Sequence, residues 1–333
     1  MNMDMTRKKK SSLKLNQSLL LVFVIFGLII IASIVNPRFI RISNLVNILQ
    51  QISVLGIIAC GVGMLLIAGQ IDISVGAQVS LMGILMAMII ERGFKIPPDA
   101  ANAWMTAWTI PFAILATLVI GAFLGLFTGF IVIHSRASSF IVTLALGSVY
   151  KGLALLISKG SSFSLYGKFE LLGRGQILNG LPVSIIFFVL IVALTYVLLK
   201  YTRYGRFLYS IGGNRKAAFV SGINTTRVTM RGFISVGLLN ALAALILISR
   251  VGTALATTAD AYSLDALAAI VVGGVSITGG KGTAMSIFLG VLLIGLVGNA
   301  LVVMNINPYL RGVAIGTIII ISVTFGEMSE NKR

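Results

Sequence analysis

Long runs of apolar residues alternate with short polar segments along most of this chain. A helix needs about 20 apolar residues, at 1.5 Å of rise each, to cross roughly 30 Å of hydrocarbon. Runs of about that length recur through residues 18–326, so the pattern predicts an all-α polytopic membrane domain of about ten transmembrane helices. The predicted spans lie near residues 18–36, 50–69, 74–91, 107–133, 139–158, 181–199, 229–249, 265–280, 284–304 and 311–326.

The third, eighth and tenth runs are the shortest or most interrupted, so eight or nine spans would also fit the pattern. With ten spans, both termini lie on the same side of the membrane. The predicted organisation is a basic tail at 1–17, a transmembrane domain at 18–326 that contains one long polar loop at 200–231, and a short tail at 327–333.

Basic residues indicate the orientation of these spans. Seven Lys and Arg residues fall within 200–231 with no acidic residue among them, and "RKKKSSLK" at 7–14 precedes the first run. Lys and Arg collect on the cytoplasmic side of membrane proteins, so we expect both termini and the 200–231 loop in the cytoplasm. The first run is too long for the core of a signal peptide and no A-x-A site follows it, so we expect it to remain as a helix.

Composition excludes several other classes of protein. Of 333 residues, 57% are hydrophobic and 11% are charged, whereas soluble chains carry roughly 25% charged residues. The net charge of +17 is not arranged as a basic strip interleaved with aromatic residues, so we expect no nucleic-acid partner. The single cysteine, Cys60, lies in an apolar run, and the sequence has neither a metal-ligand cluster nor a nucleophile beside a base. We therefore expect no enzyme activity, metal or cofactor in this chain.

The 200–231 loop contains the signals of a short helix. Gly212 and Gly213 precede Asn214, a good N-cap residue; Ala217 and Ala218 favour helix; and Gly222 is placed to end it in a left-handed turn. A helix of about two turns is marginal alone in water, so it should gain stability by lying against something. Its apolar Phe219 either docks into a groove of a cytoplasmic partner or touches anionic lipid, and the spacing alone favours neither.

Two glycine patterns predict close backbone packing. "GGKGT" at 279–283 resembles the end of a phosphate-binding loop, but Gly282 stands where Ser or Thr is required and no strand precedes it, so we expect no ATP site here. Residues 273–283 are instead predicted to form a turn between two short helices. Gly121, Gly125 and Gly129 form a small-residue face, which packs either inside the subunit or between two subunits.

Polar residues inside the predicted spans have two interpretations. A path for a neutral solute needs hydroxyl and amide groups without fixed charge, whereas the same groups also form hydrogen bonds between helices. The sequence alone leaves both roles open for each residue. The candidates for a translocation path are Gln51, Gln78, Thr143, Asn240 and Asn299.

Three charged residues also lie at or within predicted spans. Asp72 and Asp265 each precede an apolar run, so each is a candidate helix N-cap or a contact for gating. The stretches around them, "IDISVGAQVSL" and "LDALAAIVVGG", open the third and eighth spans, which would relate the two halves as an inverted repeat. Lys151 is expected to extend its ammonium group towards the outer surface, because a charge at the bilayer centre costs about 2.5–3.5 kcal/mol.

Four stretches together resemble the permease subunits of the monosaccharide-type bacterial ABC importers, which serve ribose, xylose, arabinose and galactose. They keep the order found in that family and extend over about two-thirds of the chain. The stretches are "AGQIDISVGAQVSL" (68–81), "SSFIVTLALGSVYKGLALL" (138–156), "GRFLYSIGGNRKAAFVSGI" (205–223) and "SLDALAAIVVGGVSITGGKGT" (263–283).

The resemblance implies a ten-helix permease of the bacterial inner membrane that translocates a small neutral sugar. It implies a second permease copy or paralogue, ATPase subunits that hold ATP and magnesium, and an extracytoplasmic sugar-binding protein that docks on the loops at 91–107, 159–180 and 250–264. The stretch matching 212–223 lies in the loop taken to couple to the ATPase. The alternative is a secondary transporter driven by H⁺ or Na⁺, which usually carries acidic residues near mid-span.

Overall fold

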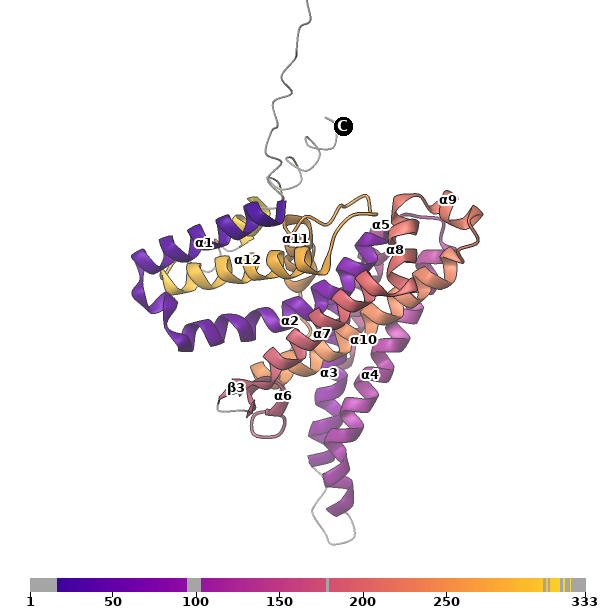
Figure 1. Ribbon diagram of the computed structural model, residues 1–333. Helices are drawn as coiled ribbons and strands as arrows, with labels where there is room; N and C mark the ends of the chain where they lie inside the picture. The colour runs from indigo at the N-terminus through magenta and orange to yellow at the C-terminus, as the bar shows by residue number, and fades with distance from the viewer. Residues whose placement is uncertain are drawn as a thin grey trace, which may run out of the picture.

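The computed structural model describes residues 17–94, 103–177, 180–307, 310, 312–317, 320 and 324. The predicted tails at 1–17 and 327–333 lie outside these residues almost entirely, as does most of the predicted tenth span. The described part of the chain is built from helices, with four two-residue strands and one short 3-10 helix, η1 (Pro37–Ile40) (Figure 1). The helical class predicted from the apolar runs is therefore confirmed.

Most helices follow the predicted spans closely. The long ones are α1 (Gln17–Val35), α2 (Ile42–Ile67), α3 (Val75–Phe94), α4 (Ala103–His134), α5 (Ser139–Ser158), α7 (Val183–Tyr201), α10 (Thr225–Val251) and α12 (Ala284–Val303). The short ones are α6 (Leu171–Arg174), α8 (Arg203–Gly213), α9 (Arg215–Val220) and α11 (Tyr262–Val272).

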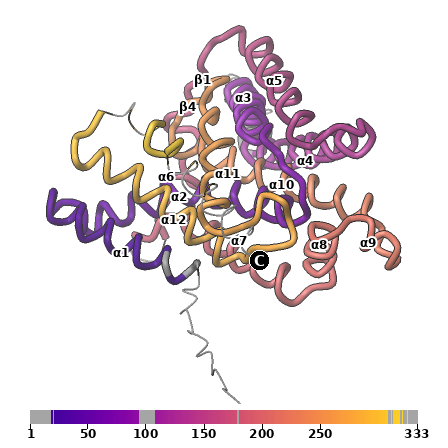
Figure 2. The backbone as a smooth tube through the Cα atoms, turned by 90° about the horizontal axis from the view of Figure 1, so that it is seen from above, coloured from indigo at the N-terminus to yellow at the C-terminus, as the bar shows by residue number. Residues whose placement is uncertain are grey.

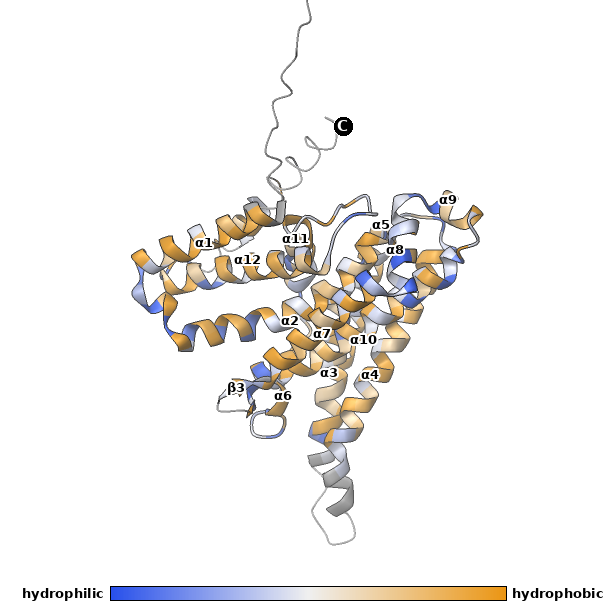
Figure 3. Cartoon of the chain, viewed as in Figure 1, coloured by the Kyte–Doolittle hydropathy of each residue, from blue (hydrophilic) through white to orange (hydrophobic). Residues whose placement is uncertain are grey.

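Within the described residues, seven helices are long and apolar enough to cross a membrane, namely α2, α3, α4, α5, α7, α10 and α12. Apolar segments of α1 and α11 are shorter. Figure 3 shows apolar residues covering nearly every long helix, with polar residues gathered around α8 and α6. The chain is thus a multi-pass membrane protein, while a total of ten spans stays a prediction.

The eighth predicted span is wrong in its extent. The sequence pattern placed a span at 265–280, but α11 ends at Val272 after 11 residues. Gly274, Gly279 and Gly280 have positive φ angles of 98°, 91° and 73°, which a continuing right-handed helix does not allow. Residues 273–283 therefore form an irregular connection to α12, as the glycine pattern predicted, although α12 itself is a full 20 residues.

Helix α10 packs along α4 and α2 in the middle of the bundle, as the view from above indicates (Figure 2). A Cβ at Gly121 would overlap the carbonyl oxygen of Gly237, and one at Gly125 would overlap that of Phe233. The small-residue face of α4 therefore allows two helix backbones of the same subunit to approach closely. Of the two predicted roles of these glycines, packing inside the subunit is the one confirmed, rather than packing between two subunits.

The two ends of α10 define the two ends of the bundle. Its first turn follows α8 and α9, with Asn224 accepting a hydrogen bond from the N–H of Arg227 as N-cap. At its last turn, Gly252 ends the helix with a φ of 78°, and α6 packs beside it. Two antiparallel strand pairs lie near this end. Strand β1 (Phe163–Ser164), before α6, pairs with β4 (Thr253–Ala254), after α10. Strands β2 (Gln176–Ile177) and β3 (Leu181–Pro182) pair with each other between α6 and α7.

Candidate functional site

Helix α9 has the local structure that its sequence predicted. The Asn214 side chain accepts a hydrogen bond from the N–H of Ala217 at 3.0 Å, which satisfies a free donor of the first turn. At the other end, Ser221 is the C-cap and Gly222 follows it with a φ of 84°. The N–H of Ile223 then donates to the carbonyl of Ala218 at 3.1 Å, which closes a Schellman-type end.

The exposed face of α9 is apolar at its tip. Ala218 is buried against the bundle, whereas Phe219 is 69% exposed and Val220 is 85% exposed. Basic residues on α8, on α9 and in the first two turns of α10 are exposed. Two adjacent apolar side chains at such exposure can dock into a partner protein or lie against lipid. The basic residues are Arg203, Arg206, Arg215, Lys216, Arg227 and Arg231.

Helix α8, which precedes α9, packs against the glycine-rich turn at 273–283 between α11 and α12. The N–H of Gly280 donates to the carbonyl of Ile67 at 2.8 Å, and the Tyr209 hydroxyl donates to the carbonyl of Gly282 at 2.8 Å. A Cβ at Gly212 would overlap both the Ile67 carbonyl oxygen and the Gly280 amide nitrogen, whereas one at Gly213 would meet open space. Sequence reasoning found Gly212 and the turn separately and missed that they touch.

A buried polar network joins α3, α4, α5 and α10. Gln78 donates from its Nε2 atom to the Ser74 hydroxyl at 2.8 Å, and its Oε1 atom accepts from the Asn240 amide at 3.0 Å. The hydroxyl groups of Thr128 and Tyr150 are 2.8 Å apart, and Gln78 Nε2 lies 3.4 Å from the former. Gln78 and Asn240 have no exposed surface. They therefore connect helices, which is one of the two roles that the sequence left open.

The other polar candidates divide between packing and a cavity. Thr143 accepts a hydrogen bond from the N–H of Ile73 at 3.1 Å, and Asn299 exchanges hydrogen bonds with Asn44 at 2.9 and 3.1 Å. Both side chains lie in the interior of the subunit. Gln51, in contrast, is exposed and lines a cavity.

Neither aspartate is the N-cap of the helix that follows it. Asp265 lies in the first turn of α11, whose N-cap is Ala261. Asp72 precedes α3 by three residues, and its Oδ1 atom accepts from the N–H of Ser74 at 2.9 Å and from its hydroxyl at 2.6 Å. Within the described residues, the other oxygen of Asp72 has no hydrogen-bond partner. The N-cap interpretation was therefore wrong, because each helix begins at a different distance from its aspartate.

Lys151 extends towards the 250–264 connection, which the sequence predicts on the outer side, and forms an ion pair there. Its Nζ atom lies 2.6 Å from Oδ2 of Asp260, with both side chains about 40% exposed. The partner is 109 residues away in sequence, so the pair ties α5 to the connection between α10 and α11. A partly exposed pair contributes about 1 kcal/mol or less, but it lowers the cost of an ammonium on an apolar helix.

Two adjoining cavities lie beside the last turn of α10. The larger, of about 460 Å³, includes Thr258 and Asp265 in its lining, and the smaller, of about 330 Å³, includes Gln51. Arg250 and Tyr262 line both. The sequence analysis named Gln51 and Asp265 as candidates but did not place them near each other. It did not single out Arg250 or Tyr262. Arg250 could have been noticed, because it is an isolated arginine at the end of the apolar helix α10 that lies opposite the basic loop.

These features together define a class of protein. The described residues contain no group of three His, Cys, Asp or Glu side chains that could hold a metal ion. They contain span-length apolar helices, buried polar contacts between those helices, and a basic surface with an apolar tip at one end. That combination is typical of a polytopic membrane transport protein.

Comparisons with known proteins identify the family. Residues 44–323 match the family described as "Branched-chain amino acid transport system / permease component". The chain is 39% identical to the ribose import permease protein of Bacillus subtilis over 90% of this chain and 89% of that protein. It is 33% identical to the ribose import permease protein of Escherichia coli K12, with 92% and 91% covered, and 32% identical to the galactose/methyl galactoside import permease protein of Haemophilus influenzae, with 99% and 100% covered.

The chain belongs to this permease family, within the group of monosaccharide ABC importer permeases. It is a multi-pass protein of the inner membrane and not an enzyme, because in such importers a separate subunit hydrolyses ATP. Membership also implies an ATPase and a substrate-binding protein as partners. The alternative of an ion-driven carrier without an ATPase is therefore wrong. No solved structure matches the chain.

Proposed function

We propose that this chain is the permease that carries a small neutral sugar, a ribose-like pentose or a hexose, across the inner membrane. The names of its relatives support this substrate class, since they are a ribose and a galactose permease. Of the candidate path residues, Gln51 lines a cavity, and its uncharged amide suits a neutral solute. The family description names amino acids, so the sugar is a proposal that needs its own test.

The basic loop supports an orientation with α8 and α9 in the cytoplasm. Seven Lys and Arg residues lie within 200–231, and a bias of this kind sets the orientation of membrane proteins. The α6 end of the bundle then faces outwards. A sugar-binding protein would dock there, on the loops at 91–107, 159–180 and 250–264, of which residues 95–102 and 178–179 lie outside the described residues.

The single observation that carries the coupling mechanism is the exposed apolar tip of α9. Phe219 and Val220 would enter a groove of the ATPase subunit, while the capped and glycine-ended helix holds them in place. Closure of two ATPases around ATP and magnesium would move α9. The movement would pass through Gly212 to the end of α2 and to the 273–283 turn, because these backbones touch.

A second permease, either another copy of this chain or a paralogue, would complete the pathway beside this subunit. Exposed apolar side chains on α4, α5 and α7 supply surface for that partner and for membrane lipid. Neither ATP nor magnesium is assigned to this chain, because the 279–283 stretch lacks the Ser or Thr of a phosphate-binding loop.

Replacing Phe219 with aspartate should release the ATPase. A charge placed at the centre of an apolar docking site loses the burial of the ring and adds a desolvation cost, so we expect at least a tenfold loss of ATPase that copurifies with the tagged chain in mild detergent. The matched control is Leu171→Asp, because Leu171 on α6 is 70% exposed and Phe219 is 69% exposed.

The control should retain the ATPase, since it lies at the other end of the bundle. Equal recovery with both variants would show that α9 does not hold the ATPase. The sugar is tested separately, by ATP-driven uptake of labelled ribose and galactose into vesicles that contain the permease, its ATPase and its binding protein. Uptake of neither sugar would overturn the proposed substrate class while leaving the coupling result intact.

A further inference from the structure

The two cavities beside the last turn of α10 form one recess inside a single subunit. Their volumes are about 330 and 460 Å³, and they meet at Arg250 and Tyr262. Ligand pockets of proteins usually measure roughly 300–1,000 Å³. The lining side chains come from α2, α10, α11, α12 and the connection before α11, so no second copy of the chain is needed to build the recess.

The lining combines a few polar groups with an apolar wall. Arg250 and Tyr262 are half-buried, and Asp265 is buried. Gln51 adds an amide at the rim of the smaller cavity, whose wall includes Leu55. An apolar wall with a small number of placed polar groups is the general form of a small-molecule site.

The charges of the lining select among ligands. The Arg250 guanidinium offers only hydrogen-bond donors, and the Asp265 carboxylate offers only acceptors when it is ionised. A hydroxyl group both donates and accepts, so a molecule with several hydroxyl groups can use both residues. An anion would face the carboxylate and a cation would face the guanidinium, each at a cost in free energy. A zwitterion would pair with both groups as well, so the lining selects a ligand without net charge. Among such ligands, a polyhydroxylated one agrees with the sugar permeases that the chain resembles.

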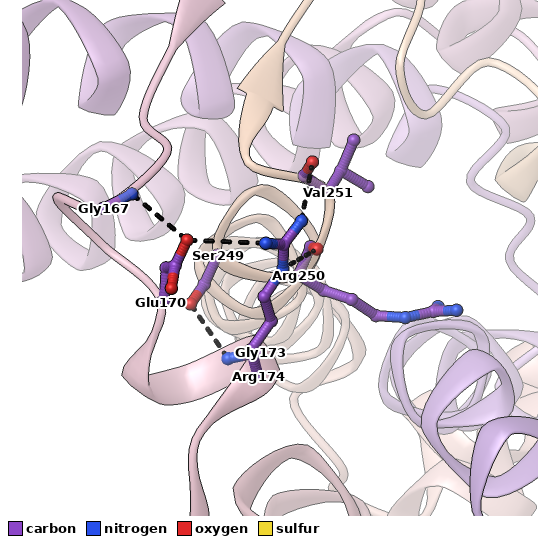
Figure 4. A network of polar contacts seen from close by, with 7 residues as sticks. All are labelled: Gly167, Glu170, Gly173, Arg174, Ser249, Arg250 and Val251. Atoms are coloured by element: carbon purple, nitrogen blue, oxygen red, sulfur yellow. Dashed lines mark hydrogen bonds and ion pairs between the residues drawn. The ribbon is translucent and has the colours of Figure 1, made fainter.

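The recess is joined to α6 by hydrogen bonds (Figure 4). The N–H of Gly173 donates to the Ser249 hydroxyl at 2.9 Å, and Nε of Arg174 donates to the carbonyl of Arg250 at 2.8 Å. Arg174 also lies 3.4 Å from Glu170. The side chain of Arg250 leaves this network and extends away from it (Figure 4). A shift of α6 would therefore move the backbone that carries the Arg250 side chain.

We propose that this recess, lined by Gln51, Arg250, Tyr262 and Asp265, binds a neutral polyhydroxylated ligand within one permease subunit. Arg250 donates to the oxygen atoms of the ligand, Asp265 accepts from its hydroxyl groups, and Tyr262 covers one apolar face. The hydrogen bonds to α6 make occupancy sensitive to contacts made at that end of the bundle. This proposal rests on the proposed function, whose sugar would be the ligand.

Cysteine protection tests the site directly. Cys60→Ala removes the single cysteine, and Leu301→Cys then places a thiol in the smaller cavity. Ser161→Cys is the control, because Ser161 is exposed in the connection between α5 and β1 and lines neither cavity. The assembled transporter in vesicles is treated with a membrane-impermeant maleimide, with or without ribose, galactose or ribose 5-phosphate.

We expect ribose or galactose to slow the labelling of Leu301→Cys at least threefold, with no effect at Ser161→Cys and no protection by ribose 5-phosphate. Adding Arg250→Lys should remove the protection, since an ammonium does not reproduce the donors of a guanidinium. Copurification of the ATPase verifies that each variant has assembled.

Three results would overturn the proposal: a thiol at 301 that does not react, equal slowing at both positions, or stronger protection by ribose 5-phosphate than by ribose. Sugar uptake is measured in the same vesicles with the parent chain. Sugar uptake without protection of the thiol would reject the ligand site in the recess and leave the proposed function standing. Absence of both uptake and protection would reject the ligand site and the proposed function.

Discussion

Replacing Gly212 with alanine is expected to destabilise the chain by about 1–3 kcal/mol and to abolish ATP-driven uptake. The added methyl group would overlap the Ile67 carbonyl oxygen and the Gly280 amide nitrogen. Both are backbone atoms, so no side chain can rotate to make room. The strain would fall on the hydrogen bond from Gly280 to Ile67, which holds the 273–283 turn against α2.

Gly213→Ala is the matched control, one residue further along the same helix. A Cβ there meets no atom within 4 Å, and the residue lies in the last turn of α8 without a positive φ angle. Alanine should therefore be neutral, or stabilising by up to about 1 kcal/mol through its better helix propensity. Thermal unfolding of the purified protein in detergent, together with vesicle uptake, compares the two. Equal unfolding temperatures would show that the contact at Gly212 carries no strain.

The parts of the fold that could be predicted depend on neighbours in sequence. Apolar run length located α5 to the residue, because crossing the membrane requires a fixed length of helix. Asn214 and Gly222 bounded α9 correctly, since capping acts over three or four residues. Among the predicted spans, the clear failure was the one at α11, where apolar character continued past Val272 while glycines with positive φ ended the helix.

The parts that could not be predicted depend on partners that are distant in sequence. A single chain does not show that Gln78 faces Asn240, 162 residues later, or that Lys151 meets Asp260. Helical periodicity indicates that a polar residue lies on some face and leaves open whether that face meets a helix or a cavity. Arg250 was missed for the same reason, because its significance comes from the recess that four helices and one connection build around it.

Replacing Asp72 with asparagine is expected to remove a pH dependence of stability. Asp72 lies in the connection between α2 and α3 and is 2% exposed. Burial raises the pKa of its carboxyl group from 3.8 to about 6, and the hydrogen bonds from Ser74 only partly oppose this rise. Between these two pH values the folded state binds more protons than the unfolded state, so stability falls as pH rises from about 4 to about 6.

Above pH 6 the buried carboxylate of the parent chain costs about 3 kcal/mol, from a shift of about two pKa units at 1.36 kcal/mol each. Asparagine keeps the oxygen that accepts from Ser74 and does not ionise. Thermal unfolding should therefore give similar values for the two chains at pH 4 and a more stable variant at pH 7.

Asp260→Asn is the matched control, because Asp260 is half-exposed and paired with Lys151. That variant should keep the fall in stability between pH 4 and pH 6, since Asp72 is intact, and lose about 1 kcal/mol or less. Parallel pH profiles for the parent chain and Asp72→Asn would show that Asp72 is not the group that titrates.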